Sequence, residues 1–250
     1  MRSLTSTLDC IGVGTGRNVS VLRDLFGFFR GRLPDDPTGA AVTVSLQAQL
    51  RALAGRHVHL NVISVGLDTL DATGQRDADN KIDYAIHRTR TIYATVSLGV
   101  GRVEHYAISA ADSAGRDDLG SEGEADDLSD EWSVPNDGID AFVVRNISDT
   151  DFVGISPRPG DCDKGDKDDG LVAGEINRGA EAFSRTFAHE IGHYLNLPHN
   201  HGDDCPDTTA EQNNLMAQTR CAISARTSVL LTGAQGTTMR GRCQTRSGCP

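Results

Sequence analysis

Apolar residues recur along this chain with the spacings expected of a mixed α/β protein. Val58, Leu60 and Val62 alternate with their neighbours, as in a strand that buries one face. Residues 139–147 (IDAFVVRNI) are almost continuously apolar, which is typical of a central strand buried on both faces. The pattern therefore predicts strands at residues 57–67, 102–109, 139–147 and 171–176.

Helical spacing appears in two further stretches. One is residues 18–30, where apolar residues recur every three or four positions. The other lies between the first two strands, where we expect Asp79 to cap a helix running through Ile82, Ala85 and Ile92. A strand, a helix and a strand in this order predict a right-handed crossover. Residues 112–137 are rich in Asp, Glu, Ser and Gly and predict a long solvated loop.

The candidate chemistry lies in TFAHEIGHYLNLPHN, residues 186–200. His189 and His193 are four residues apart, so on a helix both imidazoles can face one point. Catalytic zinc takes three protein ligands and leaves one position open, and His199 would be the third ligand. Glu190 would then take a proton from water at that position, as the H-E-x-x-H motif requires. A surface helix without metal is the alternative.

The helix is expected to end directly after the second histidine. Pro198 cannot continue the hydrogen-bond ladder, and it disfavours helical geometry at Leu197. For the chain to reverse and bring His199 to the metal, one residue near the helix end needs a positive φ. Asn196 suits that role best. His201 stays open as an alternative third ligand.

Residues 189–199 (HEIGHYLNLPH) resemble the long zinc motif of the metzincin metalloproteases, H-E-x-x-H-x-x-G-x-x-H. Met216, seventeen residues after the third histidine, matches the methionine of the family's Met-turn, which packs beneath the zinc. Residues 231–240 are similar to the C-terminal helix of pappalysin-like members. Two positions depart from the pattern. Asn196 replaces a glycine, which its tolerance of left-handed backbone allows, and Gln218 stands where several members have a tyrosine that assists the transition state.

The resemblance implies the metzincin architecture, a mixed and twisted α/β sheet with two main helices and a loop-rich C-terminal subdomain. We accordingly divide the chain into an N-terminal segment (1–50), a subdomain with the sheet and zinc helix (51–197) and a C-terminal subdomain with the Met-turn (198–250). The first segment is either a packed helix or a pro-segment whose Cys10 binds the zinc in a latent form. The family also implies a substrate strand paired with a sheet edge above the metal.

The predicted function is hydrolysis of peptide bonds in a protein or peptide by a Zn²⁺ enzyme. His189, His193 and His199 would hold the ion and Glu190 would act as general base. The ligand pattern by itself indicates only metal-assisted hydrolysis, and endopeptidase action follows from the resemblance. Two alternatives stay open: a catalytically inactive zinc-binding interaction module, and a narrow-specificity peptidase of toxin-like or self-processing type.

Six cysteines without a Cys-x-x-Cys pair predict disulfides formed in an oxidising compartment. We therefore expect a secreted protein, although the first residues lack the apolar core of a signal peptide. Of the fifteen pairings that six cysteines allow, we choose Cys205 with Cys221, which would tie the zinc-binding loop to the segment after the Met-turn.

The net charge is −11, and residues 111–170 carry eighteen acidic residues against five basic ones. Such a surface repels phosphates, so we expect no nucleic-acid partner. No run of eighteen apolar residues occurs, so we expect no membrane span. Between Asp161 and Asp169, aspartates alternate with glycines. This stretch is either a charged turn or a Ca²⁺ site, although it lacks the final glutamate of an EF-hand. The sequence does not predict an oligomeric state.

Overall fold

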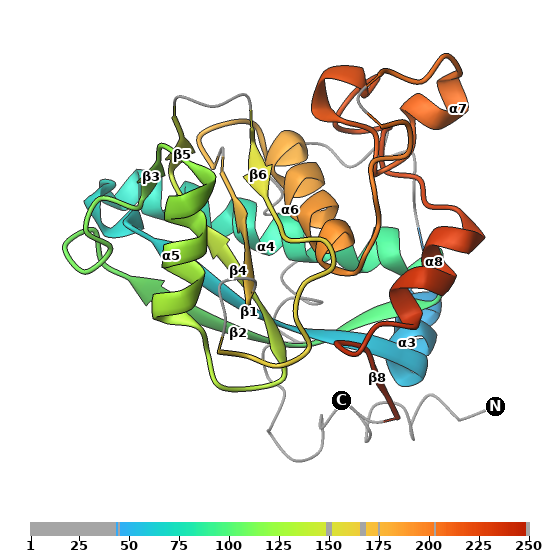
Figure 1. The fold of residues 1–250 in the computed structure, drawn as a ribbon, viewed down its shortest axis with the longest axis horizontal. Helices are drawn as coiled ribbons and strands as arrows, with labels where there is room; N and C mark the ends of the chain where they lie inside the picture. Colours follow the sequence, from blue (N-terminus) through green and yellow to red (C-terminus); the bar gives the residue numbers. More distant parts are fainter. Residues whose placement is uncertain are drawn as a thin grey trace.

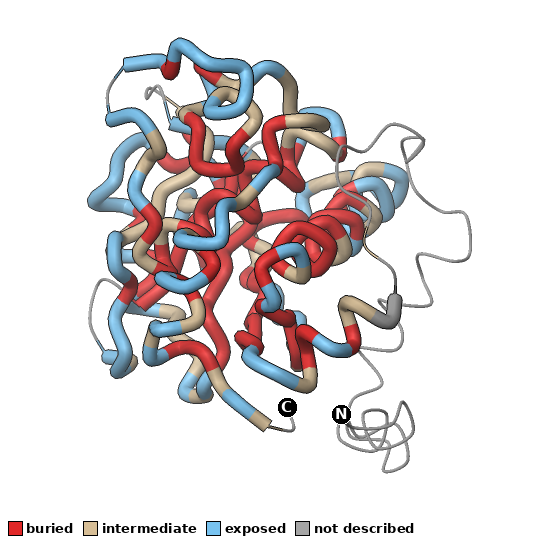
Figure 2. The backbone as a smooth tube through the Cα atoms, turned by 90° about the vertical axis from the view of Figure 1, so that its right-hand side faces the viewer, coloured by how far each residue is buried: buried red, intermediate tan, exposed pale blue. Residues whose placement is uncertain are grey.

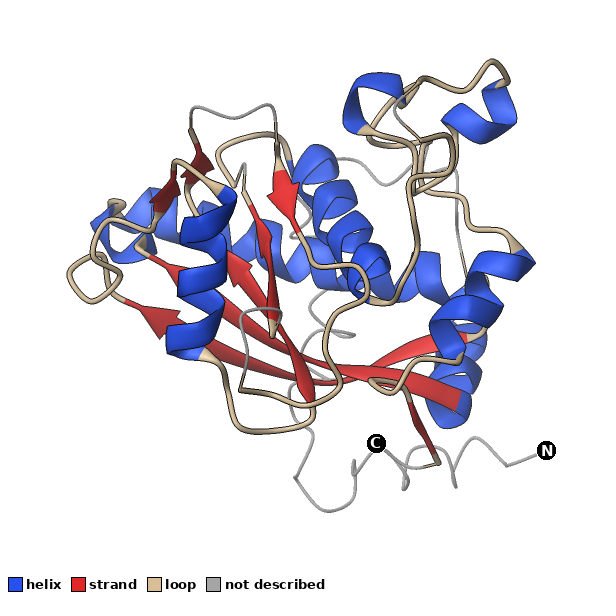
Figure 3. Cartoon of the chain, viewed as in Figure 1, coloured by secondary structure: helices blue, strands red, loops and turns tan. Residues whose placement is uncertain are grey.

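The computed structural model describes residue 44 and residues 46–148, 152–165, 169–174, 176–202 and 204–248. In this part of the chain one sheet has the strand order β2-β1-β4-β7-β6, and β8 also pairs with β1 (Figure 3). β1, β2, β4 and β7 are parallel neighbours, whereas β6 and β8 run antiparallel to theirs. The strands are β1 (Arg56–Val65), β2 (Leu98–Ile108), β3 (Asp118–Leu119), β4 (Gly138–Val143), β5 (Asn146–Ile147), β6 (Gly154–Ile155), β7 (Gly170–Ala173) and β8 (Arg246–Ser247), with β3 and β5 forming a separate pair.

Helices cover both faces of the sheet, with α4 and α6 on one face and α5 on the other (Figure 1). The side chains of β4 show this division, because Ile139, Ala141 and Val143 pack in one core cluster with α4 and α6. Phe142 belongs to a second cluster together with Leu128 of α5. The helices are α3 (Leu46–Gly55), α4 (Ala72–Ala94), α5 (Glu122–Trp132), α6 (Ala180–Tyr194), α7 (Thr209–Gln212) and α8 (Gly233–Arg240), with 3₁₀ turns η1 (Leu67–Thr69) and η2 (Thr219–Cys221).

The predicted mixed α/β fold class is confirmed, with a mainly parallel sheet between helices. Buried segments gather in the middle of the molecule and exposed segments lie around them (Figure 2). The two strands joined by α4 are parallel neighbours, as the predicted crossover requires. β4 is buried along its whole length, as its largely apolar sequence predicted, but it ends at Val143 and residues 146–147 form the separate strand β5.

The predicted start of the crossover helix is wrong. α4 begins at Ala72, and its cap is Asp71, whose Oδ1 accepts hydrogen bonds from the N–H groups of Thr73 (3.0 Å) and Gly74 (2.7 Å). Asp79 lies inside the helix and is exposed. The first two turns have no large apolar side chain, so apolar spacing could not reveal them, whereas the capping aspartate satisfies two N–H groups that would otherwise lack partners.

The loop predicted at residues 112–137 is also wrong in part, because it contains β3 and α5. Ser121 caps α5 by accepting a hydrogen bond from the N–H of Glu124 at 3.3 Å. The negative charges of the glutamates in the first turn stabilise the helix, because they lie at the positive end of its dipole. Ala125 and Leu128 are buried against the sheet at helical spacing, so one apolar face outweighs the acidic composition.

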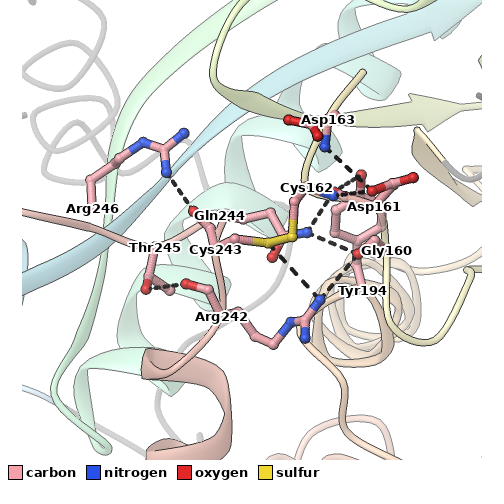
Figure 4. Close-up of a disulfide and its surroundings, with 10 residues drawn as sticks. All are labelled: Gly160, Asp161, Cys162, Asp163, Tyr194, Arg242, Cys243, Gln244, Thr245 and Arg246. Atoms are coloured by element: carbon pink, nitrogen blue, oxygen red, sulfur yellow. Dashed lines mark hydrogen bonds between the residues drawn. A yellow bond between two sulfur atoms is a disulfide. The ribbon is translucent and has the colours of Figure 1, made fainter. Parts of the chain in front are cut away.

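One disulfide lies within the C-terminal part, and a second ties this part to the rest of the chain. The predicted Cys205–Cys221 bond is present, and a second bond joins Cys162 to Cys243. Around this second bond, Gln244 Nε2 donates to the carbonyls of residues 160 (3.0 Å) and 161 (2.7 Å), as Figure 4 shows. These contacts bring the segment after α8 beside the loop that follows β6.

Several predictions fall on residues that the structure does not describe. The predicted helix at residues 18–30, Cys10 and Cys249 all lie outside the described residues. Most of the predicted N-terminal segment (1–50) lies outside them as well. The three-part division of the chain stays a prediction. Among the described helices, none is both long enough and apolar enough to cross a membrane.

Candidate metal centre

α6 carries the first two histidines of the candidate centre. Its residues Phe183, Phe187 and Ile191 recur every four positions and are fully buried, so they fix which way the helix faces. His189 and His193 lie one turn apart on a neighbouring strip of the same helix. His189 is 5 % exposed, and the His193 side chain is half-buried.

The chain reverses directly after α6, as predicted. Asn196 has φ 71°, the left-handed conformation that was expected there. Its N–H donates to the carbonyl of His193 at 2.7 Å, and the N–H of Leu197 donates to the carbonyl of Gly192 at 2.9 Å. These two bonds satisfy carbonyls at the helix end and turn the chain back, so that His199 faces the two histidines of α6.

The three imidazoles meet at their Nε2 atoms. His199 Nε2 lies 3.3 Å from Nε2 of His189 and 3.2 Å from Nε2 of His193. Among the described residues, these three form the only group of His, Cys, Asp or Glu side chains close enough to hold a metal ion, with ligand atoms within 4.8 Å of one another. His201 is exposed and lies outside the group. The structure therefore brings together the three predicted histidines and leaves out the alternative.

Hydrogen bonds set the ring tautomers of the two helix histidines. Nδ1 of His189 lies 2.7 Å from the carbonyl oxygen of Leu215, and Nδ1 of His193 lies 2.6 Å from that of Leu197. A carbonyl oxygen can only accept, so each Nδ1 carries the proton. Each Nε2 then offers a lone pair to the common point, which is the arrangement of metal-binding histidines.

Burial favours the neutral state that metal binding requires. It lowers the pKa of His189 well below its usual value and that of His193 to about 4. Two neutral imidazoles, with the Nε2 atom of a third histidine within 3.3 Å of both, suit Zn²⁺, which binds histidine nitrogen in tetrahedral sites. The donor set therefore fits the ion that the sequence predicts.

Glu190 follows the first histidine and is 5 % exposed. Burial raises the pKa of its carboxyl group to about 8, and the positive charge of Arg185 acts in the opposite direction. The side chain lies directly against Gly154 of β6, because a Cβ placed on Gly154 would be 2.5 Å from both Cγ and Oε1 of Glu190. The sequence analysis missed Gly154, since nothing local marks a glycine that a distant helix approaches.

Met216 packs against α6, and its place beneath a bound zinc stays a prediction. It is fully buried, and its Sδ would be 2.7 Å from a Cβ placed on Gly192. The helix can approach the methionine this closely because residue 192 is glycine. Asn214 Oδ1 accepts a hydrogen bond from the N–H of Met216 at 2.9 Å, and the N–H of Asn200 donates to the carbonyl of Met216 at 3.1 Å. The turn is thus bonded to the loop that carries the third histidine.

Gln218 occupies the position where several metzincins have a tyrosine. Its Nε2 lies 3.5 Å from Nδ1 of His199 and donates to the carbonyl of Gly202 at 2.9 Å. Its Oε1 accepts a hydrogen bond from Nε of Arg220 at 2.7 Å. The side chain therefore lies against the third histidine.

Arg185 was also missed by the sequence analysis. It precedes His189 by one turn of α6, is 3 % exposed, and directs its guanidinium at backbone carbonyls around the Met-turn. Burial lowers its pKa to about 10, and the nearby Glu190 acts in the opposite direction. It therefore carries its positive charge at neutral pH.

Two aspartates in the described part of the Asp161–Asp169 loop accept hydrogen bonds from backbone N–H groups of the same loop. Asp161 Oδ1 accepts hydrogen bonds from the N–H groups of residues 162 (2.5 Å) and 163 (3.3 Å), and Asp169 accepts one from Gly165. Lys164 Nζ lies 2.7 Å from Oδ1 of the buried Asp140. Within the described residues these aspartates form no metal-binding group, so calcium stays a prediction.

The four scattered histidines are placed apart from the candidate centre. His57 and His59 are buried in β1, at 0 % and 6 % exposed, and burial lowers the pKa of His59 to about 4. His87 is half-buried in α4, and His105 is exposed in β2.

No family model matches the sequence. No curated protein matches it either. Among solved structures, mirolysin in complex with compound 9 aligns with a TM-score of 0.50 and 16 % identity over 74 % of this chain and 90 % of the mirolysin chain. A structure of a chaperone-substrate complex aligns with a TM-score of 0.46 and 14 % identity over 76 % of this chain and 34 % of that one. The chain thus has the fold of mirolysin, a metallopeptidase.

Proposed function

We propose that this chain is a secreted zinc-dependent endopeptidase of the metzincin type. One observation carries the proposal: the Nε2 atoms of three histidines converge on a single point, and a buried carboxyl group follows the first of these histidines in the chain. The shared fold with a metallopeptidase supports peptide hydrolysis as the reaction. Two disulfides support an oxidising, extracellular environment.

His189, His193 and His199 would hold the ion. Bound zinc would polarise the scissile carbonyl group and lower the pKa of water. Glu190 would accept a proton from the attacking water and pass it to the leaving amine. Burial raises the pKa of Glu190, so its ionised carboxylate is a stronger base than that of an exposed glutamate.

The substrate is proposed to bind as an extended strand beside β6. Within the described residues β6 pairs only with β7, so its other side offers unpaired backbone groups. Gly154 of this strand lies against the side chain of Glu190. A peptide paired there would run close to the general base.

Replacing Glu190 with Gln tests the proposal. The variant should bind zinc as the unchanged protein does and cleave casein or gelatin about 10²–10⁴-fold more slowly, because it lacks the base. Glu122→Gln, on the exposed start of α5, is the matched control and should keep full activity. Zinc content is measured in all three proteins. Equal activity with and without Glu190, or no cleavage by any zinc-loaded protein, would instead favour the interaction module.

The ligand set has a separate test. Elemental analysis after zinc loading should find one zinc per chain in the unchanged protein and in His201→Ala. His199→Ala should lose most of the metal, because within the described part of the chain His199 is the one further ligand that reaches the other two rings. Retention of zinc by His199→Ala and its loss from His201→Ala would refute the assignment.

A further inference from the structure

Arg185 forms the connection between α6 and the Met-turn. Its Nε donates to the carbonyl of Ser228 at 3.0 Å, and its Nη2 donates to the carbonyls of Leu215 (3.2 Å) and Ala217. Its Nη1 lies 3.4 Å from Oγ1 of Thr219. One buried side chain thus holds three carbonyls and a hydroxyl from the segment that contains Met216.

One of these carbonyls also orients a histidine. The oxygen of Leu215 accepts from Nη2 of Arg185 and from Nδ1 of His189, which lies 2.7 Å away. A carbonyl oxygen has two lone pairs, so these two donors fill its capacity. The position of the Leu215 carbonyl therefore depends on Arg185, and the orientation of the His189 ring depends on that carbonyl.

We propose that Arg185 is a positioning residue for the metal centre. Arg185 holds the carbonyl group of Leu215 in place, and this carbonyl group fixes the tautomer and the orientation of the His189 ring. This inference rests on the proposed zinc site. The observation that supports it is that Arg185 and His189 share the carbonyl oxygen of Leu215 as a hydrogen-bond acceptor. Groups that hydrogen-bond to a ligating histidine set its orientation, and losing them typically lowers metal affinity 10–100-fold.

The geometry requires an arginine at this position. The guanidinium is a planar group with five donors, which can serve acceptors lying in different directions at once. A lysine places three donors on one nitrogen, so it cannot reach Ser228, Leu215 and Ala217 together. Arg185→Lys therefore keeps the charge and removes the simultaneous contacts.

Arg90 provides a matched control. It is 4 % exposed, lies on α4, and donates to the carbonyls of Val100 and Gly101, both at 3.4 Å. Arg90→Lys is the same substitution at an equally buried arginine bonded to backbone carbonyls, but these carbonyls belong to β2 and not to the segment around Met216.

The experiment makes two measurements on each protein. The zinc dissociation constant is measured by competition with a chelator after metal-free protein has been reloaded with zinc. The melting temperature is measured on the metal-free protein. Arg185→Lys should weaken zinc binding at least tenfold, and Arg90→Lys should change it less than threefold at a comparable loss of melting temperature. Unchanged affinity in Arg185→Lys, or equal weakening in both variants, overturns the inference. Absence of zinc binding by the unchanged protein would instead refute the zinc site itself.

NMR on the unchanged protein tests the same inference if the lysine variant does not fold. The Nδ1–H of His189 and the guanidinium N–H groups of Arg185 should exchange slowly with solvent, because both are buried and bonded to the same carbonyl. Rapid exchange at Arg185, with a freely rotating guanidinium, would overturn the inference.

Discussion

Gly154→Ala tests whether the position of Glu190 determines activity. Gly154 does not have a positive φ, so alanine is acceptable to the backbone and only the available space matters. The added Cβ would lie 2.5 Å from Cγ and Oε1 of Glu190 and 2.6 Å from Cδ. Carbon atoms in contact prefer roughly 3.5–4.0 Å. Either the carboxyl group or β6 must therefore move by about 1 Å.

Movement of the carboxyl group or of β6 should lower the free energy of unfolding only modestly but should lower the catalytic rate strongly. Crowding of this kind destabilises a folded protein by about 1–3 kcal/mol. A misplacement of about 1 Å in a catalytic group can lower the rate roughly 10²-fold. We expect kcat/KM for a fluorogenic peptide to fall about 10–100-fold while the zinc dissociation constant stays within threefold, because the three atoms nearest the new methyl group all belong to Glu190.

Gly138→Ala is the control for crowding within the sheet. Its Cβ would lie 2.9 Å from Nδ2 of Asn61, at the start of β4. It should lower the melting temperature and leave kcat/KM nearly unchanged. If Gly154→Ala folds, binds zinc and cleaves peptide within threefold of the unchanged protein, then Glu190 does not act from the position described here.

The remaining predictions concern stability and the turn after α6. Because burial lowers the pKa of His59 from 6.5 to about 4, the unfolded chain takes up a proton there first as the pH falls. The contribution of His59 to the free energy of unfolding is therefore complete above pH 6.5, and it falls by up to about 3 kcal/mol as the pH is lowered to 4. Urea unfolding across this range should show a smaller loss of unfolding free energy in His59→Gln than in the unchanged protein. Replacing both Cys162 and Cys243 with Ser opens a loop of 81 residues and should lower the free energy of unfolding by roughly 4 kcal/mol, measured the same way. Asn196→Gly should be nearly neutral at φ 71°, whereas Asn196→Val should destabilise by about 1–2 kcal/mol and weaken zinc binding; equal zinc affinity in the two variants would contradict the role of this turn.

Local sequence signals predicted the convergence of the three histidines. The spacing of the motif is a property of one helix and one turn, so the proline after the helix and Asn196 sufficed to predict the reversal that brings in His199. The Cys205–Cys221 bond also spans a short separation of 16 residues. In both cases the interacting residues lie close together in the chain.

The groups that support the site could not be predicted in the same way. Gly154 and Glu190 are 36 positions apart, and the carbonyls held by Arg185 follow it by 30 or more. Their contacts depend on how β6 and the Met-turn pack against α6, and neither a lone glycine in a strand nor an arginine in an apolar helix signals such packing. α5 was missed for another reason, because its acidic composition concealed a narrow apolar face.

Contacts from other parts of the chain hold α6 along its whole length, and this explains how the histidines are kept in place. At its start, the hydroxyl of Tyr84 donates to Glu181 at 2.5 Å, and in its middle Arg185 binds the Met-turn. At its end, the N–H of Gly160 donates to the carbonyl of Tyr194 at 3.0 Å, beside the Cys162–Cys243 bond (Figure 4). Metal and catalytic groups need placement to within about 0.5 Å. A helix fixed at its start, middle and end meets that need, so changes at either end should alter zinc affinity without touching a histidine.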